Sequence, residues 1–224
     1  MKRAIVTALV CMSAAAIRAD IIMDATNLNG AFDTSATGSG ARTFDQTPNW
    51  YNIGTGNQTA TAVNDTLSAA PASGWNAVIS DNGLGGAVVH SVNTGYTLQL
   101  GDYFNISYDW RDAAGWEAND QVRVAVAAYD NDNAVTGTEI WREWVLDKVT
   151  TAATWESVSG QTAAVSASAA GRTLFIQTYG INGGLGSGDF ARVDNIVVAV
   201  VPEPGTLALF SLGLVVLAVI RKRG

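Results

Sequence analysis

The chain has 224 residues and an acidic balance, with 13 basic and 20 acidic side chains and a net charge of −7. Three of the basic residues lie in the first 19 residues and three in the last four, and only one acidic residue, Glu203, lies outside residues 20–200, whose net charge is therefore −12. Such a domain lacks the Lys and Arg stripes that nucleic acid and anionic lipid surfaces require, so we expect no nucleic-acid partner. One cysteine and one histidine exclude a metal site of the His/Cys kind.

Residues 1–19 have the layout of a secretory signal peptide. Two basic residues begin the segment, an uncharged apolar stretch runs from Ala4 to Ala16, and small residues mark the cleavage site. We expect cleavage after Ala19, with Ala16 as the alternative, and no lipid on Cys11, because the residues before it lack the usual lipoprotein pattern. The mature domain would then contain no cysteine, so its stability would depend on core packing and bound ions rather than on disulfides.

Residues 20–200 predict one all-β domain, because no helical periodicity and no internal repeat is found in them. In YFNISYDW, residues 103–110, apolar side chains alternate with more polar ones, and clusters of Gly, Asn and Asp between such runs supply turns. We predict strands at residues 96–100, 103–110, 121–129, 138–146, 172–179 and 191–200. The less regular residues 35–72 predict long loops or edge strands. The whole pattern indicates a two-sheet antiparallel β-sandwich.

No motif assigns a catalytic role to any residue of this domain, so we predict that it is not an enzyme. His90 lies in an apolar run, where a lone histidine is typical of a strand rather than of a hydrolase triad. Asp130 and Asp132 have the spacing of a calcium loop, but apolar residues occupy later ligand positions, so the stretch predicts an Asp/Asn turn. Several carboxylates near strand ends form either a pair for glycoside hydrolysis or a solvated rim. They are Asp109, Asp112, Glu117, Asp120, Glu139 and Glu143.

Seven tryptophans offer a different chemistry, because a flat aromatic ring stacks on the apolar side of a sugar. Most of them should be core residues. Trp141 and Trp144 lie three apart on one predicted strand and therefore point to opposite faces, so only one of them can be buried in the sandwich. Aromatic residues in loop-like surroundings are the ligand-binding candidates, unless they close the end of the sandwich. They are Trp50, Tyr51, Trp75 and Trp116.

Residues 201–224 predict a membrane anchor. The uncharged run 205–220 has 16 residues, which is short for a span, but it has no polar face, as a helix of a soluble domain would need. A basic tail after the run would stay on the cytoplasmic side of the inner membrane. A buried soluble helix is the alternative. The flanking residues are Pro202, Glu203 and Pro204 in residues 201–204, and Arg221, Lys222 and Arg223 in residues 221–224.

This ending resembles the PEP-CTERM sorting signal of exported bacterial proteins. The Pro-Glu-Pro motif, the short span, the basic tail and the paired signal peptide all agree with such a signal. The resemblance implies that an exosortase cuts at residues 202–204 and releases the domain for attachment or export. If the span is not removed, residues 205–220 form a permanent anchor.

The domain itself is similar to jelly-roll carbohydrate-binding modules and galactose-binding-like domains, through NGAFD at residues 29–33, ATWESVSG at residues 153–160 and ARVDNIVV at residues 191–198. In such modules a structural calcium often joins the early segment to the last strand. The resemblance therefore implicates Asp33 and Asp194 as calcium ligands. The alternative is that Asp194 only ends the sheet pattern at an edge.

These features together predict an exported, membrane-tethered protein, sorted to the envelope, the cell surface or an extracellular polysaccharide matrix. Glycan binding is the leading function. The alternatives are a structural matrix or adhesion protein without a small ligand, and a glycoside-active enzyme. A groove with solvent-facing Trp50 or Trp116 beside polar side chains would favour binding. Burial of all seven tryptophans would favour the structural role, and two converging carboxylates would favour the enzyme.

Overall fold

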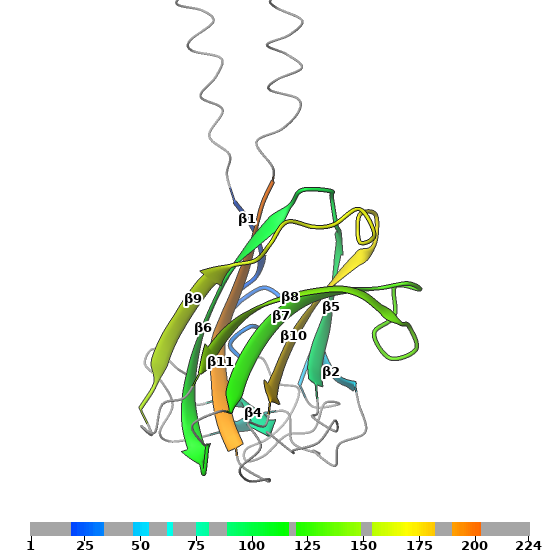
Figure 1. Cartoon of the computed structure of the whole chain (residues 1–224). Helices are drawn as coiled ribbons and strands as arrows, with labels where there is room; N and C mark the ends of the chain where they lie inside the picture. The colour runs from blue at the N-terminus through cyan, green and yellow to red at the C-terminus, as the bar shows by residue number, and fades with distance from the viewer. Residues whose placement is uncertain are drawn as a thin grey trace, which may run out of the picture.

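The computed structural model describes residues 19–33, 47–53, 62–64, 75–80, 89–116, 120–148, 154–181 and 190–202. Nearly all of the predicted signal peptide, the run 205–220 and Glu117 lie outside these residues. The described residues form eleven strands in two antiparallel sheets that pack face to face, with no helix among them (Figure 1). No helix that could cross a membrane is therefore found in this part of the chain. The predicted all-β sandwich is confirmed.

The six-stranded sheet is built around two long strands, β6 and β11, which pair over most of their length. Its order is β3-β4-β11-β6-β9, and β1 also pairs with β11. Every pairing in it is antiparallel. The strands are β1 (Asp20–Met23), β3 (Ala62–Asn64), β4 (Trp75–Ser80), β6 (Tyr103–Ala114), β9 (Glu156–Gln161) and β11 (Phe190–Val201).

The five-stranded sheet has the order β2-β5-β10-β7-β8, again with antiparallel pairings throughout. Neighbours in this sheet come from distant parts of the sequence, since β5 and β10 pair in the centre. The strands are β2 (Trp50–Ile53), β5 (Val89–Thr97), β7 (Gln121–Tyr129), β8 (Glu139–Lys148) and β10 (Thr173–Ile181).

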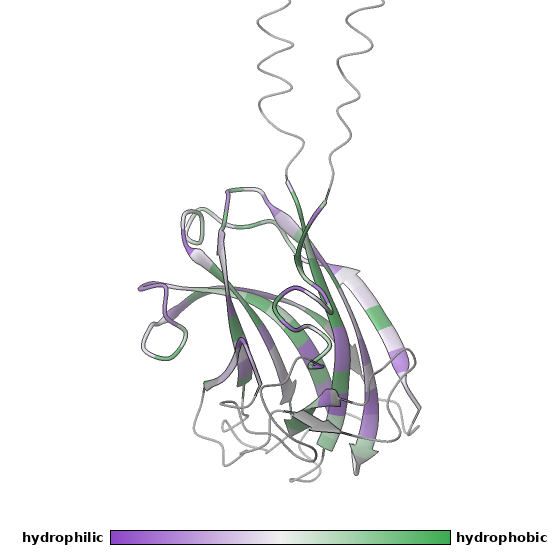
Figure 2. Ribbon diagram, turned by 180° about the vertical axis from the view of Figure 1, so that it is seen from behind, coloured by the Kyte–Doolittle hydropathy of each residue, from purple (hydrophilic) through white to green (hydrophobic). Residues whose placement is uncertain are grey.

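The main core lies between the two sheets and follows the alternation along each strand. On β6, Phe104, Ile106, Tyr108 and Trp110 are all buried, whereas the residues between them are more exposed. Figure 2 shows the same alternation of hydrophobic and hydrophilic residues along the long strands. The period of two in this sequence therefore sets which face of the sheet is buried.

A second, smaller apolar cluster covers part of the outer face of the five-stranded sheet. Its buried members are Ile53, Ala127, Tyr129, Ala134 and Phe175. Ala134 belongs to the β7–β8 loop, so this loop packs against the face opposite the main core. The five-stranded sheet is therefore covered on both faces over part of its surface, which explains why β7 is buried almost throughout.

The predicted strand at residues 96–100 is wrong beyond Thr97, where β5 ends. Residues 98–102 form a turn, and Gly101 adopts a positive φ of 87°. The Asp102 carboxylate accepts hydrogen bonds from the Gln99 backbone N–H at 3.1 Å and the Tyr96 hydroxyl at 2.6 Å, and this closes the turn. Where residues 35–72 are described, at 47–53 and 62–64, they include the short strands β2 and β3, and each lies at the edge of its sheet.

Both ends of the described domain lie side by side. Asp20 on β1 pairs with Val200 on β11, and Val201 is the last residue of β11 (Figure 1). The segment after β1 then crosses β11 at an irregularity in its pairing, where the Ile196 N–H donates to the Gly30 carbonyl at 2.9 Å. A Cβ on Gly30 would collide with the Ile196 carbonyl oxygen, so this crossing requires glycine.

Candidate functional site

A line of side chains crosses all five strands on the outer face of the five-stranded sheet. Strand register places Tyr51, Ser91, Gln177, Ala125 and Trp144 side by side, one residue from each strand. At about 4.8 Å between strands, the line spans about 19 Å. Aromatic side chains therefore stand at both edges of this face, with small or polar groups between them.

Gln177 is the centre of a hydrogen-bond network on this face. Its side-chain Nε2 donates to the Tyr129 hydroxyl at 2.8 Å, and its Oε1 accepts from the Arg142 guanidinium at 2.9 Å. Arg142 also pairs with Glu139, and its guanidinium lies 5.1 Å from the centre of the Tyr179 ring. Burial acts to lower the pKa of Arg142, but Tyr179, Glu139 and Tyr129 together raise it above its usual range, so this side chain stays charged. The network holds each polar group in one orientation.

Trp144, at the β8 edge, is the exposed tryptophan of its strand. It is 40% exposed, whereas Trp141 is 9% exposed and faces the core, so the prediction that they point to opposite faces is confirmed. The Arg123 guanidinium lies 4.6 Å from the centre of the Trp144 ring and is held by two hydrogen bonds to the Gln121 side chain. One face of this ring is thus already covered by a cation.

The β7–β8 loop, residues 130–138, borders the other part of this face. The Asp130 carboxylate accepts a backbone N–H from the end of the loop, and the Asn133 side chain accepts two backbone N–H groups within it. The Asp132 carboxylate accepts the backbone N–H of Thr173 at 2.8 Å. The predicted Asp/Asn turn is confirmed, because these side chains bind the backbone.

A pocket of about 240 Å³ lies where this loop meets the sheet. It is lined by Tyr51, Asn93, Asp132, Asn133, Val135 and Phe175. Tyr51 is half-buried, and this burial raises the pKa of its hydroxyl, although a hydrogen bond with Ser91 acts in the opposite direction. The pocket combines a phenol ring, two amides, one carboxylate and apolar walls. These groups can contact the apolar side of a small polyhydroxylated molecule and hydrogen-bond its hydroxyls.

Of the four aromatic residues predicted to bind ligand, Tyr51 lines this pocket. Trp50 is 3% exposed, stacks on Phe32 with ring centres 4.8 Å apart, and donates its Nε1–H to the Asn29 carbonyl. Trp116 is also 3% exposed and packs against Trp110 in the core. Trp50 and Trp116 therefore lack the open ring face that stacking on a sugar needs. The side chain of Trp75 lies outside the described residues.

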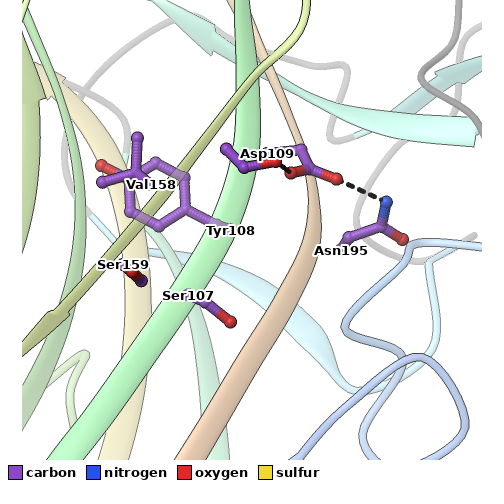
Figure 3. Close-up of a pocket in the computed structure, with 7 residues that line it drawn as sticks. Ser107, Tyr108, Asp109, Val158, Ser159 and Asn195 are labelled. Atoms are coloured by element: carbon purple, nitrogen blue, oxygen red, sulfur yellow. Dashed lines mark hydrogen bonds between the residues drawn. The ribbon is translucent and has the colours of Figure 1, made fainter.

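The outer face of the six-stranded sheet holds a second pocket, of about 280 Å³ (Figure 3). Its centre is Asp109, which accepts hydrogen bonds from the Ser157 hydroxyl at 2.5 Å and from the Asn195 side chain at 2.8 Å. Each of the two pockets contains a single carboxylate, Asp109 in one and Asp132 in the other. Asp109 is hydrogen-bonded to Ser157 and Asn195 on the six-stranded sheet, whereas Glu139 pairs with Arg142 on the five-stranded sheet.

Asp194 lies on β11, where it pairs in register with Asp109 on β6, and is 1% exposed. Its Oδ1 accepts the Asn195 backbone N–H, while its Oδ2 has no hydrogen-bond partner among the described residues. Burial raises the pKa of Asp194 to about 8, and the charges of Asp33 and Asp109 add to this effect. The structure thus brings Asp33 within electrostatic range of Asp194, as the calcium prediction requires. No group of three or more His, Cys, Asp or Glu side chains is arranged to hold a metal ion in the described part of the chain.

The sequence prediction missed most of the outer-face residues. Gln177 and Arg142 lie within strands predicted from their apolar pattern, and Asn93 lies in β5 before the predicted strand 96–100 begins. A signal was present, because Phe175, Gln177 and Tyr179 alternate with the core residues of the same strand. Three large or polar side chains on the outer face of a central strand indicate that this face has a structural or binding role.

Three solved structures illustrate what this chain resembles. The Stig cyclase Fisc from Fischerella sp. TAU, in complex with an indole compound, is 15% identical over 83% of this chain and 99% of its own, with a TM-score of 0.57. The CBM22-1–GH10 modules of xylanase 10B from Clostridium thermocellum are 17% identical over 81% of this chain and 29% of theirs, with a TM-score of 0.49. The xylan-binding module CBM15 is 14% identical over 69% of this chain and 92% of its own, with a TM-score of 0.45. At 15% identity the likeness to the cyclase shows the fold alone.

No curated protein sequence matches the chain. Residues 200–223 match the PEP-CTERM protein-sorting motif, which confirms the resemblance of the C-terminal segment to that signal. The motif begins within the last two residues of β11, so the sandwich leads into it without a linker. The protein is therefore a β-sandwich that carries a PEP-CTERM sorting motif, which implies an exported, membrane-anchored precursor.

Proposed function

We propose that the domain binds a glycan in the pocket beside Tyr51. The observation that carries this proposal is the combination of a partly exposed phenol ring with Asn93, Asp132 and Asn133 around one concave space. Glycans expose an apolar ring side and many hydroxyls, so an aromatic side chain and fixed amides suit both parts. The volume of about 240 Å³ suits one or two sugar units rather than a long chain.

Hydrogen bonds to the sheet and to the loop backbone hold the lining side chains of this pocket in place, which favours binding. Asp132 is fixed by its hydrogen bond to the backbone of β10, Asn133 is fixed by the loop that it closes, and Tyr51 is in contact with Ser91. Polar groups that are already oriented lose little conformational entropy when a ligand arrives. A preformed site of this size therefore supports recognition of a free sugar or of an accessible residue of a polysaccharide.

A glycan array probed with the full chain in mild detergent tests this function. We expect signals on a limited set of glycans, and loss of those signals in a Tyr51→Ala variant. Trp144→Ala is the matched control, because it removes an exposed aromatic side chain from the same sheet face at the opposite edge. An array without signals, or equal loss in both variants, would reject binding in this pocket.

The structural matrix or adhesion role is the second candidate function. The observation that favours it is the burial of Trp50 and Trp116 in the core, where they stabilise the sandwich and are almost fully shielded from solvent. A protein with that role would show no glycan selectivity on the array and would still be recovered with the extracellular matrix of its host. The glycoside-active alternative has less support, since each pocket contains only one carboxylate.

We also propose that an exosortase processes the precursor at Pro202, Glu203 and Pro204 and delivers the domain to the cell surface or to an extracellular polysaccharide matrix. Proline lacks the N–H needed for strand pairing, and β11 ends at Val201, immediately before Pro202. Pro202 is thus kept out of strand pairing, and an extended segment of this kind would suit a peptidase groove. Residues 205–220 and the basic residues 221–223 would stay with the inner membrane.

Calcium at Asp33 and Asp194 is a further part of the proposal. The support for it is the buried Asp194 Oδ2, which has no hydrogen-bond partner in the described residues, together with the nearby charge of Asp33. A divalent cation would compensate for the charge that burial otherwise disfavours. Backbone carbonyls and water would have to complete its shell, because two carboxylates supply only part of the oxygen ligands that calcium takes.

A further inference from the structure

We propose that the end of the sandwich where β1 begins and β11 stops rests on the lipid bilayer, with Leu100 and Ile21 as its apolar contacts. This inference depends on the predicted span 205–220 but not on glycan binding. In the anchored precursor, this end of the domain faces the membrane, and its partner is a phospholipid bilayer.

The length of the connection places this end near the membrane. Val201 is the last residue of β11, and the apolar run begins at Gly205. Four residues span at most about 14 Å when fully extended. The N-terminus of the domain lies at the same end, because Asp20 pairs with Val200 (Figure 1). A signal peptide that is still attached would thus enter the bilayer from this end too, so the same surface faces the lipid before and after its removal.

The surface at this end is formed by two loops that bind each other. The Leu98 N–H donates to the Arg172 carbonyl at 2.9 Å, and the Val165 N–H donates to the Asp102 carbonyl at 2.7 Å. Leu100 lies at the tip of the 98–102 turn and is 63% exposed. These backbone bonds fix the turn, so Leu100 is presented on a rigid support rather than on a loose loop.

Ile21 adds a second exposed apolar side chain close to this end. It is 57% exposed and pairs with Ala199, two residues before the end of β11. Four large apolar residues are exposed in the described part of the chain, and two of them, Ile21 and Leu100, are near the start of the anchor. Isolated exposed apolar residues are common on proteins, but here their position coincides with the place where the bilayer must be.

One exposed carboxylate, Asp20, lies beside Ile21 at this end, whereas the two loops themselves present little charge to lipid. The loop TAAVSASAAG, residues 162–171, contains no charged side chain. Asp102 is buried and hydrogen-bonded within the turn, and the Arg172 guanidinium lies 3.8 Å from the Asp132 carboxylate. No cluster of Lys or Arg is present in these loops, so attraction to anionic lipid is not the driving force. The anchor holds this end of the domain close to the bilayer, which gives a high effective concentration. A weak apolar contact is therefore sufficient to keep the domain docked on the lipid.

Fluorescent labels on the full chain in vesicles of neutral phosphatidylcholine test this orientation. The variants Leu100→Cys and Thr154→Cys are made in a Cys11→Ser background, so that each chain carries one label. Thr154 is exposed and precedes β9 at the opposite end, more than about 23 Å along β6 from Tyr103. With lipids that carry a quencher just below the headgroup, we expect a blue shift and loss of emission at position 100 and neither at position 154.

A second pair of variants separates apolar contact from mere proximity. With the label on Ser168→Cys, in the neighbouring loop, Leu100→Glu should reduce quenching and Leu100→Met should preserve it. A chain that floats with the vesicles but shows no quenching at position 100, or no response to Leu100→Glu, overturns the docking. A chain that does not float overturns both the docking and the anchor. Neither result affects the glycan proposal, because the glycan array tests it independently.

Discussion

Acidification should destabilise the sandwich through His90. This histidine is 1% exposed on β5, and its Nε2 lies 2.6 Å from the Val78 carbonyl oxygen on β4, so it joins the two sheets. Burial lowers the pKa of His90 to about 4, although the contact with Val78 acts to raise it. In the unfolded chain the same side chain has its ordinary pKa of about 6.5.

The sign and size of the effect follow from these two pKa values. Between about pH 6.5 and pH 4, the unfolded chain binds a proton that folded His90 does not, so the free energy of unfolding falls as the pH falls. A difference of about 2.5 pKa units corresponds to about 3 kcal/mol, lost progressively over this window and constant below it. That is a large part of the about 5–15 kcal/mol by which a typical domain is stable.

The assay is urea unfolding of the full chain in mild detergent, followed by tryptophan fluorescence at pH 7.5, 5.5 and 4. His90→Gln is the comparison, since Gln keeps a donor for the Val78 carbonyl but does not titrate. Carboxylates contribute equally to both chains and cancel in the difference. The wild type should lose about 3 kcal/mol relative to the variant between pH 7.5 and pH 4. A difference that stays constant with pH would refute the reasoning, whatever the intrinsic cost of the substitution.

Three further predictions concern other parts of the chain. If Asp33 and Asp194 bind calcium, EDTA should lower the Tm of the wild type and leave that of Asp194→Asn unchanged; an unaltered wild-type melting curve would remove the site. Gly30→Ala should lower the free energy of unfolding by about 1–3 kcal/mol in urea, because its Cβ meets the Ile196 carbonyl; no loss would contradict the close crossing. Mass spectrometry of mature protein from an exosortase-positive host should find residues 221–224 absent; their presence would leave only a permanent anchor.

The alternation along β6 and β7 predicted both the fold class and the core. The predicted strand 121–129 matches β7, and the alternation predicted in residues 103–110 corresponds to one buried face of β6, because a period of two fixes the buried face once two sheets pack. β9 was missed as a strand. Its polar sequence ESVSGQ lies at the edge of the sheet, where burial of one face is incomplete and the pattern is weak.

The candidate pocket was only partly predictable. Tyr51 was named from its loop-like surroundings, but the same reasoning selected Trp50 and Trp116, which the fold buries. Local sequence does not tell a ring that closes a core from a ring that faces solvent. The pocket joins β2, β5 and β10 to the β7–β8 loop, segments that are far apart in sequence, so their meeting depends on sheet order rather than on any local motif.

The claim that the sandwich is a glycan-binding domain is tested most directly by the affinity of the full chain for the strongest glycan of the array, measured by calorimetry in the wild type, Tyr51→Ala and Trp144→Ala. Loss of a stacked aromatic ring commonly costs about 1.4 kcal/mol or more, so Tyr51→Ala should weaken binding about tenfold or more, while Trp144→Ala should bind as the wild type does. Equal affinity of the wild type and Tyr51→Ala would contradict the account.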